Sequence, residues 1–209
     1  MLDELQQANE YIINKIIEKD TLILEMEEFA KENNVPIVTK EVAEYLKFLV
    51  DSHNFKDILE IGTAIGYSGT IMGRIAKKNG GKLTTIEIDE VRYNQALDNF
   101  KKGDLLDTVN VILGDGTVEI KKLDQTFDFI FIDASKGHYM EFFKDSIERL
   151  NENGLIFIDN IMFRGYLYKE YPKRFKTIVR RLDEFINYLY ENHNFVLMPF
   201  GDGIGLVRK

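Results

Sequence analysis

Oxygen-bearing side chains that could hold a cation follow two short apolar runs of this sequence. Asp133 comes directly after Phe127–Ile132, and Asp159-Asn160 come directly after Leu155–Ile158. If these runs are neighbouring strands of a parallel sheet, the three side chains meet beyond its carboxyl edge, where such sheets bind ligands. Oxygen ligands of this kind suit Mg²⁺ or another hard divalent ion. A lone aspartate at a strand end can equally be a turn or cap residue, so the prediction depends on all three.

Three earlier apolar runs end in small or acidic residues, a pattern that favours a site for an adenosine-containing ligand. Glycines let the backbone turn tightly and approach a ligand, and a strand-end carboxylate can accept both ribose hydroxyls. An acidic turn between two glycines could hold an adenine edge. A plain strand-to-helix turn would account for one such feature, but three on successive strands favour a binding site. In chain order the residues are Gly62 and Gly66, then Glu87, then Gly114-Asp115-Gly116.

Other classes of site are disfavoured. Ala64 stands where the second glycine of a dinucleotide-binding motif would be, which argues against an NAD-dependent dehydrogenase. The chain has no cysteine and therefore no disulfide or thiolate ligand. His53, His138 and His193 are too widely spaced for a zinc cluster, so any metal must sit on oxygen ligands. The formal charge of −8 disfavours a protein that coats nucleic acid.

The elements that must position these residues alternate between strand and helix after residue 56. This alternation predicts a mostly parallel sheet covered by helices on both faces. Two final runs flank Gly201-Asp202-Gly203 and are expected to add an antiparallel hairpin at one edge. The expected strands are Asp57–Ile61, Leu83–Ile88, Val109–Leu113, Phe127–Ile132, Leu155–Ile158, Phe195–Pro199 and Ile204–Arg208. The expected helices cover roughly 67–78, 90–102, 116–122, 138–149 and 173–191.

Residues 1–52 are expected to form helices ahead of a core at 53–209, within a single domain 1–209. Thr39 is a good N-cap for the third of these helices. No apolar run approaches the length of a membrane span, and Met1–Leu5 lacks the basic start of a secretory signal. We therefore expect a cytoplasmic protein, and the N-terminal helices could join two chains as a homodimer. Their apolar stripes are Leu5, Ile12, Ile13, Ile16 and Ile17, then Leu22, Leu24, Met26 and Phe29, then Val42, Tyr45, Leu46, Leu49 and Val50.

A family resemblance rests on four motifs, which are Leu59–Ser68, Phe129–Lys136, Asp159-Asn160 and Pro199–Gly203. They resemble the class I methyltransferases, and within them the metal-dependent caffeoyl-CoA and catechol O-methyltransferase family. The resemblance runs from about Val35 to the C-terminus. It implies an α/β, Rossmann-like fold with a seven-stranded, mostly parallel sheet, an antiparallel C-terminal hairpin and extra N-terminal helices. It also implies an S-adenosylmethionine-dependent enzyme that methylates a hydroxyl group with the help of Mg²⁺ or another divalent cation.

The resemblance also implies roles for individual residues. Asp133, Asp159 and Asn160 would ligate the metal, and two adjacent substrate oxygens would chelate it, which eases deprotonation of the hydroxyl. Lys136 would act with Asp133 in catalysis, accepting or steering the proton before in-line attack on the sulfonium methyl. Ser135 stands where the plant enzymes carry an aspartate. The S-adenosylmethionine pocket would contain Val38, Glu60, Gly62, Thr63, Ser68, Glu87, Asp115, Gly116, Asp133 and Ser135.

A basic segment next to Asp159-Asn160 bears on the acceptor. Ile161–Arg181 contains seven basic residues against one acidic residue, a local charge of +6, with aromatic residues interleaved. Cations that meet phosphates beside rings that stack bases favour single-stranded RNA, although a solvated helix face looks the same in sequence. The candidate RNA contacts are Phe163, Arg164, Lys173, Arg174, Lys176, Arg180 and Arg181.

Asn33–Pro36, Asp159–Gly165 and Arg174–Arg181 resemble the bacterial branch that methylates 5-hydroxyuridine at the tRNA wobble position to 5-methoxyuridine. The 5-hydroxyl and 4-carbonyl oxygens of that base are adjacent and can chelate one metal ion, as the oxygens of a catechol do. The expected partner is therefore tRNA. A small-molecule catechol or caffeoyl-type acceptor is the alternative within the enzyme class. A non-catalytic S-adenosylmethionine-binding module is the alternative outside it, and would bind cofactor without turnover.

Overall fold

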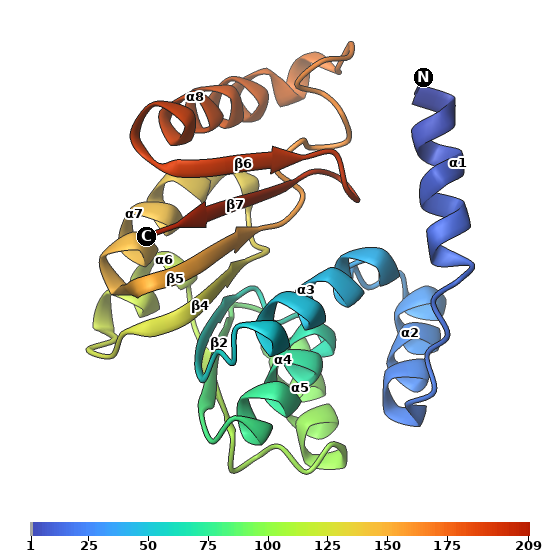
Figure 1. Cartoon of the computed structure of the whole chain (residues 1–209), viewed down its shortest axis with the longest axis vertical. Coiled ribbons are helices and arrows are strands. Elements are labelled where there is room, and N and C mark those ends of the chain that lie inside the picture. The colour runs from blue at the N-terminus through green and yellow to red at the C-terminus, as the bar shows by residue number, and fades with distance from the viewer. Residues whose placement is uncertain (1) are drawn as a thin grey trace.

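A seven-stranded sheet forms the centre of the protein (Figure 1). The computed structural model describes the chain from Leu2 to Lys209, with side chains from Gln7 onward. The strands are β1 (Asp57–Ile61), β2 (Lys82–Glu87), β3 (Val109–Leu113), β4 (Phe127–Ile132), β5 (Leu150–Ile158), β6 (Asn194–Met198) and β7 (Ile204–Arg208). Their order in the sheet is β3-β2-β1-β4-β5-β7-β6. β1 to β5 are parallel, while β7 is antiparallel to both β5 and β6, which confirms the expected parallel sheet and C-terminal hairpin.

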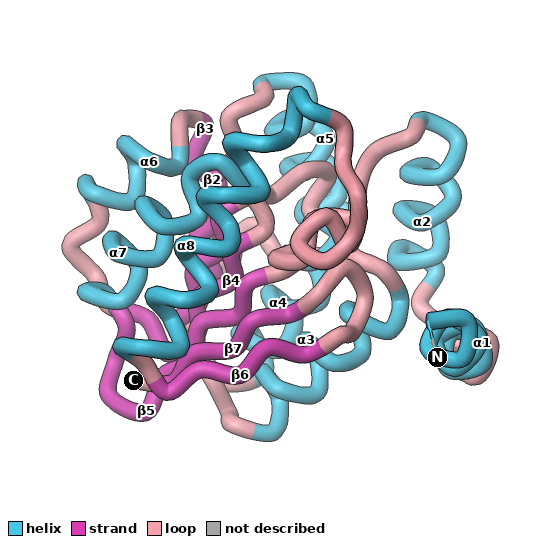
Figure 2. The backbone as a smooth tube through the Cα atoms, turned by 90° about the horizontal axis from the view of Figure 1, so that it is seen from above, coloured by secondary structure: helices cyan, strands magenta, loops and turns pink. Residues whose placement is uncertain are grey.

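Helices cover both faces of this sheet, as seen from above in Figure 2. They are α1 (Leu2–Ile13), α2 (Thr21–Asn33), α3 (Lys40–Ser52), α4 (Tyr67–Lys78), α5 (Glu90–Lys102), α6 (Gly116–Glu119), α7 (Tyr139–Arg149) and α8 (Lys176–Asn192), with short 3₁₀ turns η1 (Ile120–Lys122), η2 (Lys136–His138) and η3 (Lys173–Phe175). On β4, Phe129 and Phe131 pack toward α3, α4 and α5, whereas Ile130 and Ile132 pack toward α7 and α8. A continuous apolar run forms a strand here because both of its faces are buried. None of the described helices has the length and apolarity to span a membrane.

The N-terminal region forms three helices, as expected, but two details differ. α1 ends at Ile13, so Ile16 and Ile17 lie in the connection to α2 and not on a helical stripe. Thr39 occupies the N-cap position of α3, but its side chain makes no capping hydrogen bond. The Leu5 side chain lies outside the described residues. Dimerisation through these helices stays a prediction.

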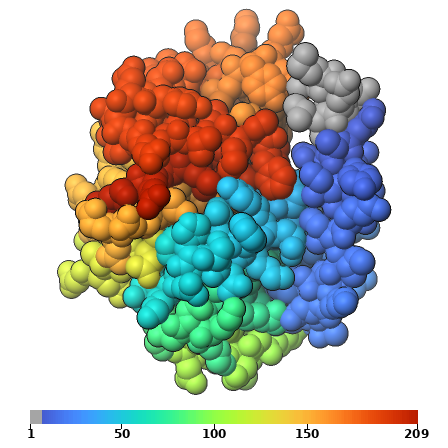
Figure 3. Space-filling model, viewed as in Figure 1, coloured from blue at the N-terminus to red at the C-terminus, as the bar shows by residue number. Residues whose placement is uncertain are grey.

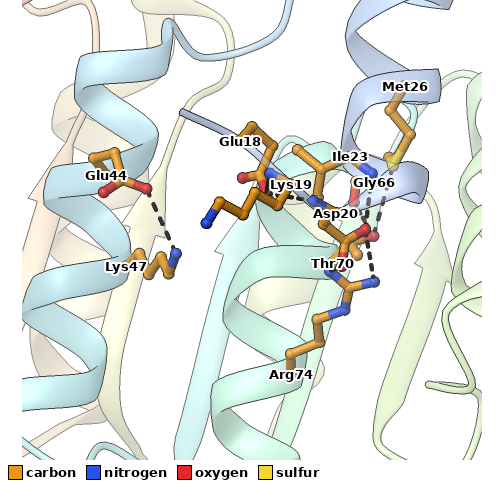
Figure 4. A network of polar contacts seen from close by, with 10 residues as sticks. All are labelled: Glu18, Lys19, Asp20, Ile23, Met26, Glu44, Lys47, Gly66, Thr70 and Arg74. Atoms are coloured by element: carbon orange, nitrogen blue, oxygen red, sulfur yellow. Dashed lines mark hydrogen bonds and ion pairs between the residues drawn. The ribbon is translucent and has the colours of Figure 1, made fainter. Parts of the chain in front are cut away.

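A polar network ties α2 to α4, the helix that follows the glycine turn after β1 (Figure 4). Asp20 caps α2 by accepting a hydrogen bond from the Ile23 amide at 3.1 Å. The same carboxylate accepts two hydrogen bonds from the Arg74 guanidinium, at 2.6 and 3.2 Å. Near the start of α4, the Thr70 hydroxyl donates to the Gly66 carbonyl at 2.7 Å. The second N-terminal helix is thereby fixed to the helix that begins at this turn.

The turn between β6 and β7 packs against α3, and the red and cyan surfaces of these segments meet in Figure 3. The rings of Tyr45 and Phe200 meet edge to face with their centroids 5.9 Å apart. Gly201 has φ +56°, and a Cβ added to it would lie 2.8 Å from Val42 Cγ2. The turn that carries Asp202 is therefore held by a helix as well as by two strands.

Candidate active site

A cavity of about 560 Å³ opens at the carboxyl ends of the parallel strands. It lies where the strand order reverses between β1 and β4, the place at which open α/β sheets bind ligands. Its walls come from the turns after β1 to β5 and from the loop before α3. The expected site residues that line it are Gly62, Glu87, Asp115, Gly116, Asp133, Ser135, Lys136 and Asn160.

The turn after β1 brings two strand ends into close contact. Gly62 has φ +103°, and a Cβ added to it would lie 2.0 Å from the carbonyl oxygen of Asp133, just after β4. Glycine is therefore required both by the close approach and by the backbone conformation. The Asp133 amide in turn donates to the Ile61 carbonyl at 3.0 Å. These contacts make the ends of β1 and β4 one continuous wall of the cavity.

The Glu87 carboxylate forms a second side of the cavity. It accepts hydrogen bonds from the backbone amides of Ala64, Ile88 and Asp89, at 2.7, 3.0 and 2.9 Å. Because Ala64 lies in the turn after β1, these bonds fix the carboxylate between two strand ends. Asp115 follows β3 and caps α6 with its side chain. Both acidic residues thus border the cavity at the turns that the sequence pattern singled out.

Glu60 lies beneath this wall and not in the cavity. The residue is 0% exposed, and its two oxygens accept hydrogen bonds from Ser68 at 2.5 Å and from Thr85 at 2.6 Å. Thr63 joins the cluster through the Thr85 hydroxyl. Burial raises the pKa of Glu60 to about 8, against the lowering effect of the two hydroxyl donors. Burial thus favours the neutral acid at Glu60, and Glu60, Thr63 and Ser68 support the cavity from behind.

Replacing Glu60 by glutamine is expected to remove a pH dependence of stability. Because the folded-state pKa of about 8 lies above the ordinary value of 4.5, the contribution of Glu60 to stability falls as the pH rises between these values. The fall is about 1.4 kcal/mol per pH unit and levels off above pH 8. Thermal unfolding of the cofactor-free protein near pH 5 and above pH 8 measures it. The variant should match the wild type at the lower pH and unfold at a higher temperature at the upper one. Equal melting temperatures at both would contradict a neutral Glu60.

Asp159 is a buried carboxylate with an unused oxygen. The residue is 1% exposed. Its Oδ1 accepts a hydrogen bond from the Asn160 amide at 2.7 Å, and its Oδ2 has no hydrogen-bond partner. Burial and the nearby Asp133 carboxylate raise the pKa of Asp159 to about 7. Burial also raises the pKa of Asp133, against the opposing effect of the Lys136 ammonium. A buried carboxylate with a free oxygen, next to the partly buried Asp133 carboxylate, forms an arrangement that a cation would satisfy.

The donors at this corner fit a hard divalent cation if the Asn160 amide supplies the third oxygen. Among the residues that the structure describes, no group of three His, Cys, Asp or Glu side chains could hold a metal ion, so a third oxygen from the protein would come from the amide. Asn160 lines the cavity together with Asp133. Its φ of +55° is a left-handed conformation that asparagine adopts more readily than most residues. The structure brings the three expected ligands together, and their role in binding a metal stays a prediction.

Neighbouring side chains hold the loops of this corner. The hydroxyl of the buried Tyr139 donates to the Asp159 carbonyl at 2.8 Å. The ring of Phe163 lies with its centre 5.9 Å from Lys136 Nζ. Arg181, in the N-terminal half of α8, donates to the carbonyl of the residue after Lys136 at 3.3 Å. The basic segment therefore reaches the loop that carries the expected catalytic lysine.

The remaining expected residues lie outside the cavity. Val38 is buried in a groove between α1, α2 and the loop before α3. Of the expected RNA contacts, Phe163 is buried. Arg180 is paired with Glu184 at 2.8 Å on the surface of α8. The exposed members of the set are Arg164, Lys173, Arg174, Lys176, Arg180 and Arg181.

Part of the cavity wall was missed by reasoning from sequence. Pro36 and Ile37 line the cavity from the loop before α3, Arg92 from α5 and Phe142 from α7. Nothing chemical distinguishes the apolar residues of this set from ordinary core residues. Arg92 could have been predicted to lie near the cavity, since it follows the strand-end Asp89 by three residues.

The strand order, with a cavity at the point where this order reverses, is that of the Rossmann-like fold of the class I methyltransferases. The family model described as O-methyltransferase matches residues 14–209. The chain therefore belongs to this family of S-adenosylmethionine-dependent O-methyltransferases.

Known proteins similar to the chain cover most of its length. Tapetum-specific methyltransferase 1 of Arabidopsis thaliana is 30% identical over 174 residues, which are 79% of this chain and 74% of that protein. Caffeoyl-CoA O-methyltransferase 2 of Populus trichocarpa is 28% identical over 193 residues, 84% of this chain and 76% of that protein. The crystal structure of an O-methyltransferase from Bacillus cereus in complex with S-adenosylhomocysteine has a TM-score of 0.84 at 25% identity and covers 100% of both chains. A crystal structure from Staphylococcus aureus has a TM-score of 0.89 at 28% identity, covering 97% of this chain and 99% of that one.

Proposed function

We propose that this enzyme transfers the methyl group of S-adenosylmethionine to 5-hydroxyuridine in tRNA, giving 5-methoxyuridine. We further propose that Asp133, Asp159 and Asn160 hold a divalent cation for this reaction. One observation supports the cation above the others: the buried Asp159 Oδ2 has no hydrogen-bond partner, and the Asp133 carboxylate lies near it. Buried polar atoms are ordinarily satisfied by a donor, a water or an ion. Mg²⁺ fits a donor set made of oxygen alone.

The residues of the chain divide the work of transfer between them. When bound, a divalent cation would supply positive charge beside the acceptor hydroxyl and ease its deprotonation. Lys136 would steer that proton as an ammonium, whose charge acts on both Asp133 and Asp159, or would receive it as a neutral amine. The Phe163 ring lies beside the Lys136 ammonium, in cation–π range. Holding donor and acceptor in line within one cavity removes a large entropic part of the barrier.

Glu87 is the proposed ribose ligand, because its carboxylate stands at the strand end where two hydroxyls can be accepted together. Replacing Glu87 by glutamine is expected to weaken binding of S-adenosylhomocysteine about ten- to a hundredfold, the range for hydrogen bonds to a charged group. Calorimetric titration measures the affinity. Glu90→Gln, an exposed position at the start of α5, is the matched control and should bind as the wild type does. Equal affinities in the two variants would remove Glu87 from the ribose site.

The proposal that tRNA is the acceptor is supported by the positive charge of the basic segment beside the cavity. The contact of Arg181 with the Gly137 carbonyl places the basic start of α8 next to Lys136. Exposed aromatic rings lie in the same segment, at Tyr168 and Tyr171. Cations for phosphates and accessible rings for a base are what binding of an unpaired nucleotide requires.

A small molecule of the caffeoyl-CoA or catechol type is the second candidate acceptor. It is favoured by the plant relatives, among them the caffeoyl-CoA O-methyltransferase of Populus trichocarpa. A coenzyme A thioester carries phosphates that could meet the same basic segment. Both candidates use the same donor pocket and the same cation site, so only the acceptor separates them.

A direct comparison of acceptors tests the proposal. The enzyme, Mg²⁺ and labelled S-adenosylmethionine are incubated separately with tRNA carrying 5-hydroxyuridine, with caffeoyl-CoA and with a catechol. We expect 5-methoxyuridine in the digested tRNA by mass spectrometry. Efficient transfer to a small molecule and none to tRNA would overturn the RNA proposal and leave the donor and cation proposals standing. Cofactor binding with no transfer to any acceptor would favour a non-catalytic binding module.

A further inference from the structure

The loop after β5 holds an unfavourable backbone conformation at several positions. Asn160, Phe163 and Arg164 have φ angles of +55°, +46° and +58°, in the left-handed region where a Cβ crowds the backbone. Gly165 follows at +72°. A bulky residue such as phenylalanine rarely adopts this region, and such conformations persist only where the surroundings hold them. The loop therefore depends on contacts from outside itself.

Those contacts come from the turn between β6 and β7. Both oxygens of the Asp202 carboxylate accept hydrogen bonds from the Arg164 amide, at 2.5 and 2.7 Å. The Asp202 carbonyl accepts from the Met162 amide at 2.9 Å, and the Gly203 carbonyl accepts from the Ile161 amide at 3.0 Å. The two segments are so close that a Cβ added to Gly203 would lie 2.3 Å from Met162 Cγ. The turn thus binds three of the four backbone amides that follow Asn160.

We infer that Asp202 is a positioning residue, whose carboxylate fixes the loop that presents Asn160 and Phe163 to the active site. Asn160 begins the loop and lines the cavity. Phe163 directly precedes the residue whose amide the carboxylate binds, and its ring lies beside Lys136 Nζ. Hydrogen bonds to a carboxylate are stronger than those between neutral groups, so this contact can hold a conformation that the loop would otherwise leave. The catalytic consequence of the inference rests on the proposed function, whereas its structural part does not.

The turn between β6 and β7 is also held by contacts that do not involve the Asp202 carboxylate. A positioning role for this carboxylate can therefore be distinguished from a general role in stability. β6 and β7 pair along their length, and Phe200 packs against Tyr45 of α3. Removing the Asp202 carboxylate should therefore leave the hairpin and its backbone bonds to Ile161 and Met162 in place, and free the loop at the Arg164 amide.

Three variants test the inference: Asp202→Ala, Asp202→Asn, which keeps one acceptor oxygen, and Asp183→Ala, which removes an exposed carboxylate from α8. Hydrogen exchange of the peptide spanning 160–168 is measured by mass spectrometry, and binding of Mn²⁺ and of S-adenosylhomocysteine is measured by titration. In Asp202→Ala we expect the loop amides to exchange at least about tenfold faster and Mn²⁺ to bind at least about tenfold more weakly, given the strength of hydrogen bonds to charged groups. Binding of S-adenosylhomocysteine and exchange in β6 and β7 should stay unchanged. Asp202→Asn should recover part of the loop protection, and Asp183→Ala should behave as the wild type.

Two results would overturn the inference. The first is wild-type loop exchange and Mn²⁺ affinity in Asp202→Ala. The second is an equal loss of protection in β6, β7 and the loop together with weaker binding of S-adenosylhomocysteine, because this would indicate a general structural role. If the wild type binds no Mn²⁺, the proposed cation site fails, and exchange of the loop alone then decides whether Asp202 positions it.

Discussion

Replacing Asp159 by asparagine is expected to lower kcat by about 10³-fold or more while the donor still binds. A catalytic cation contributes several kcal/mol of charge stabilisation, and about 1.4 kcal/mol corresponds to each factor of ten. The amide keeps the acceptor for the Asn160 N–H, so the loss should come from the missing charge rather than from a disturbed loop. Methyl transfer at saturating donor and acceptor, over a range of Mg²⁺ concentrations, measures the effect. An unchanged kcat with an unchanged Mg²⁺ requirement would remove Asp159 from the cation site.

At a pH above the Asp159 pKa of about 7, the same substitution should stabilise the cation-free protein, because it removes a buried charge whose Oδ2 has no hydrogen-bond partner. Asp128→Asn is the matched control. Asp128 lies at the opposite end of β4 from Asp133, and its carboxylate accepts hydrogen bonds from the amides of Lys56 and Asp57 at 3.0 and 3.2 Å. The control should lower the melting temperature and leave kcat unchanged. Opposite shifts in stability from the two aspartates would separate a residue kept for function from one kept for folding.

Replacing Lys136 by methionine is expected to lower kcat by about 10²- to 10⁴-fold, the range for loss of a positioned acid or base. Methionine has a similar length and can still pack against the Phe163 ring that lies 5.9 Å from Lys136 Nζ. Affinity for S-adenosylhomocysteine should change little, because the proposed ribose ligand Glu87 is untouched. Single-turnover methyl transfer measures the chemical step. A methionine variant with wild-type turnover would show that Lys136 has no part in proton transfer.

Lys136→Arg separates the two roles open to this residue. Arginine keeps the positive charge but cannot release its proton in a protein. If Lys136 accepts the proton, the arginine variant should be as slow as the methionine variant. If it only steers charge, the arginine variant should recover most of the activity.

Most of the cavity could be predicted because parallel strands end together. Once Asp57–Ile61 and Phe127–Ile132 are identified as strands, the residues after them must lie at one edge of the sheet. Gly62 and Asp133 are adjacent in the structure for this reason. The continuous apolar run of β4 likewise indicates a strand that is buried on both faces, and the run is visible in the sequence.

Other parts of the site depend on packing between distant segments, which sequence does not show. Pro36 and Ile37 reach the cavity only because α3 begins where it does. In the sequence, Asp202 cannot be told from an ordinary turn residue. Only the structure shows that its carboxylate accepts a hydrogen bond from the Arg164 amide. Glu60 was predicted to line the cofactor pocket. Its buried position depends on a hydrogen bond from the hydroxyl of Thr85 in the next strand, which the sequence does not show.

Methyl transfer with the cation removed and returned tests the central claim most directly. The enzyme is treated with EDTA, dialysed, and given labelled S-adenosylmethionine and tRNA that carries 5-hydroxyuridine. Product is then measured before and after addition of Mg²⁺. We predict no 5-methoxyuridine without Mg²⁺ and recovery of the full rate when it is restored. Formation of 5-methoxyuridine at an undiminished rate in EDTA would contradict a catalytic cation at Asp133, Asp159 and Asn160.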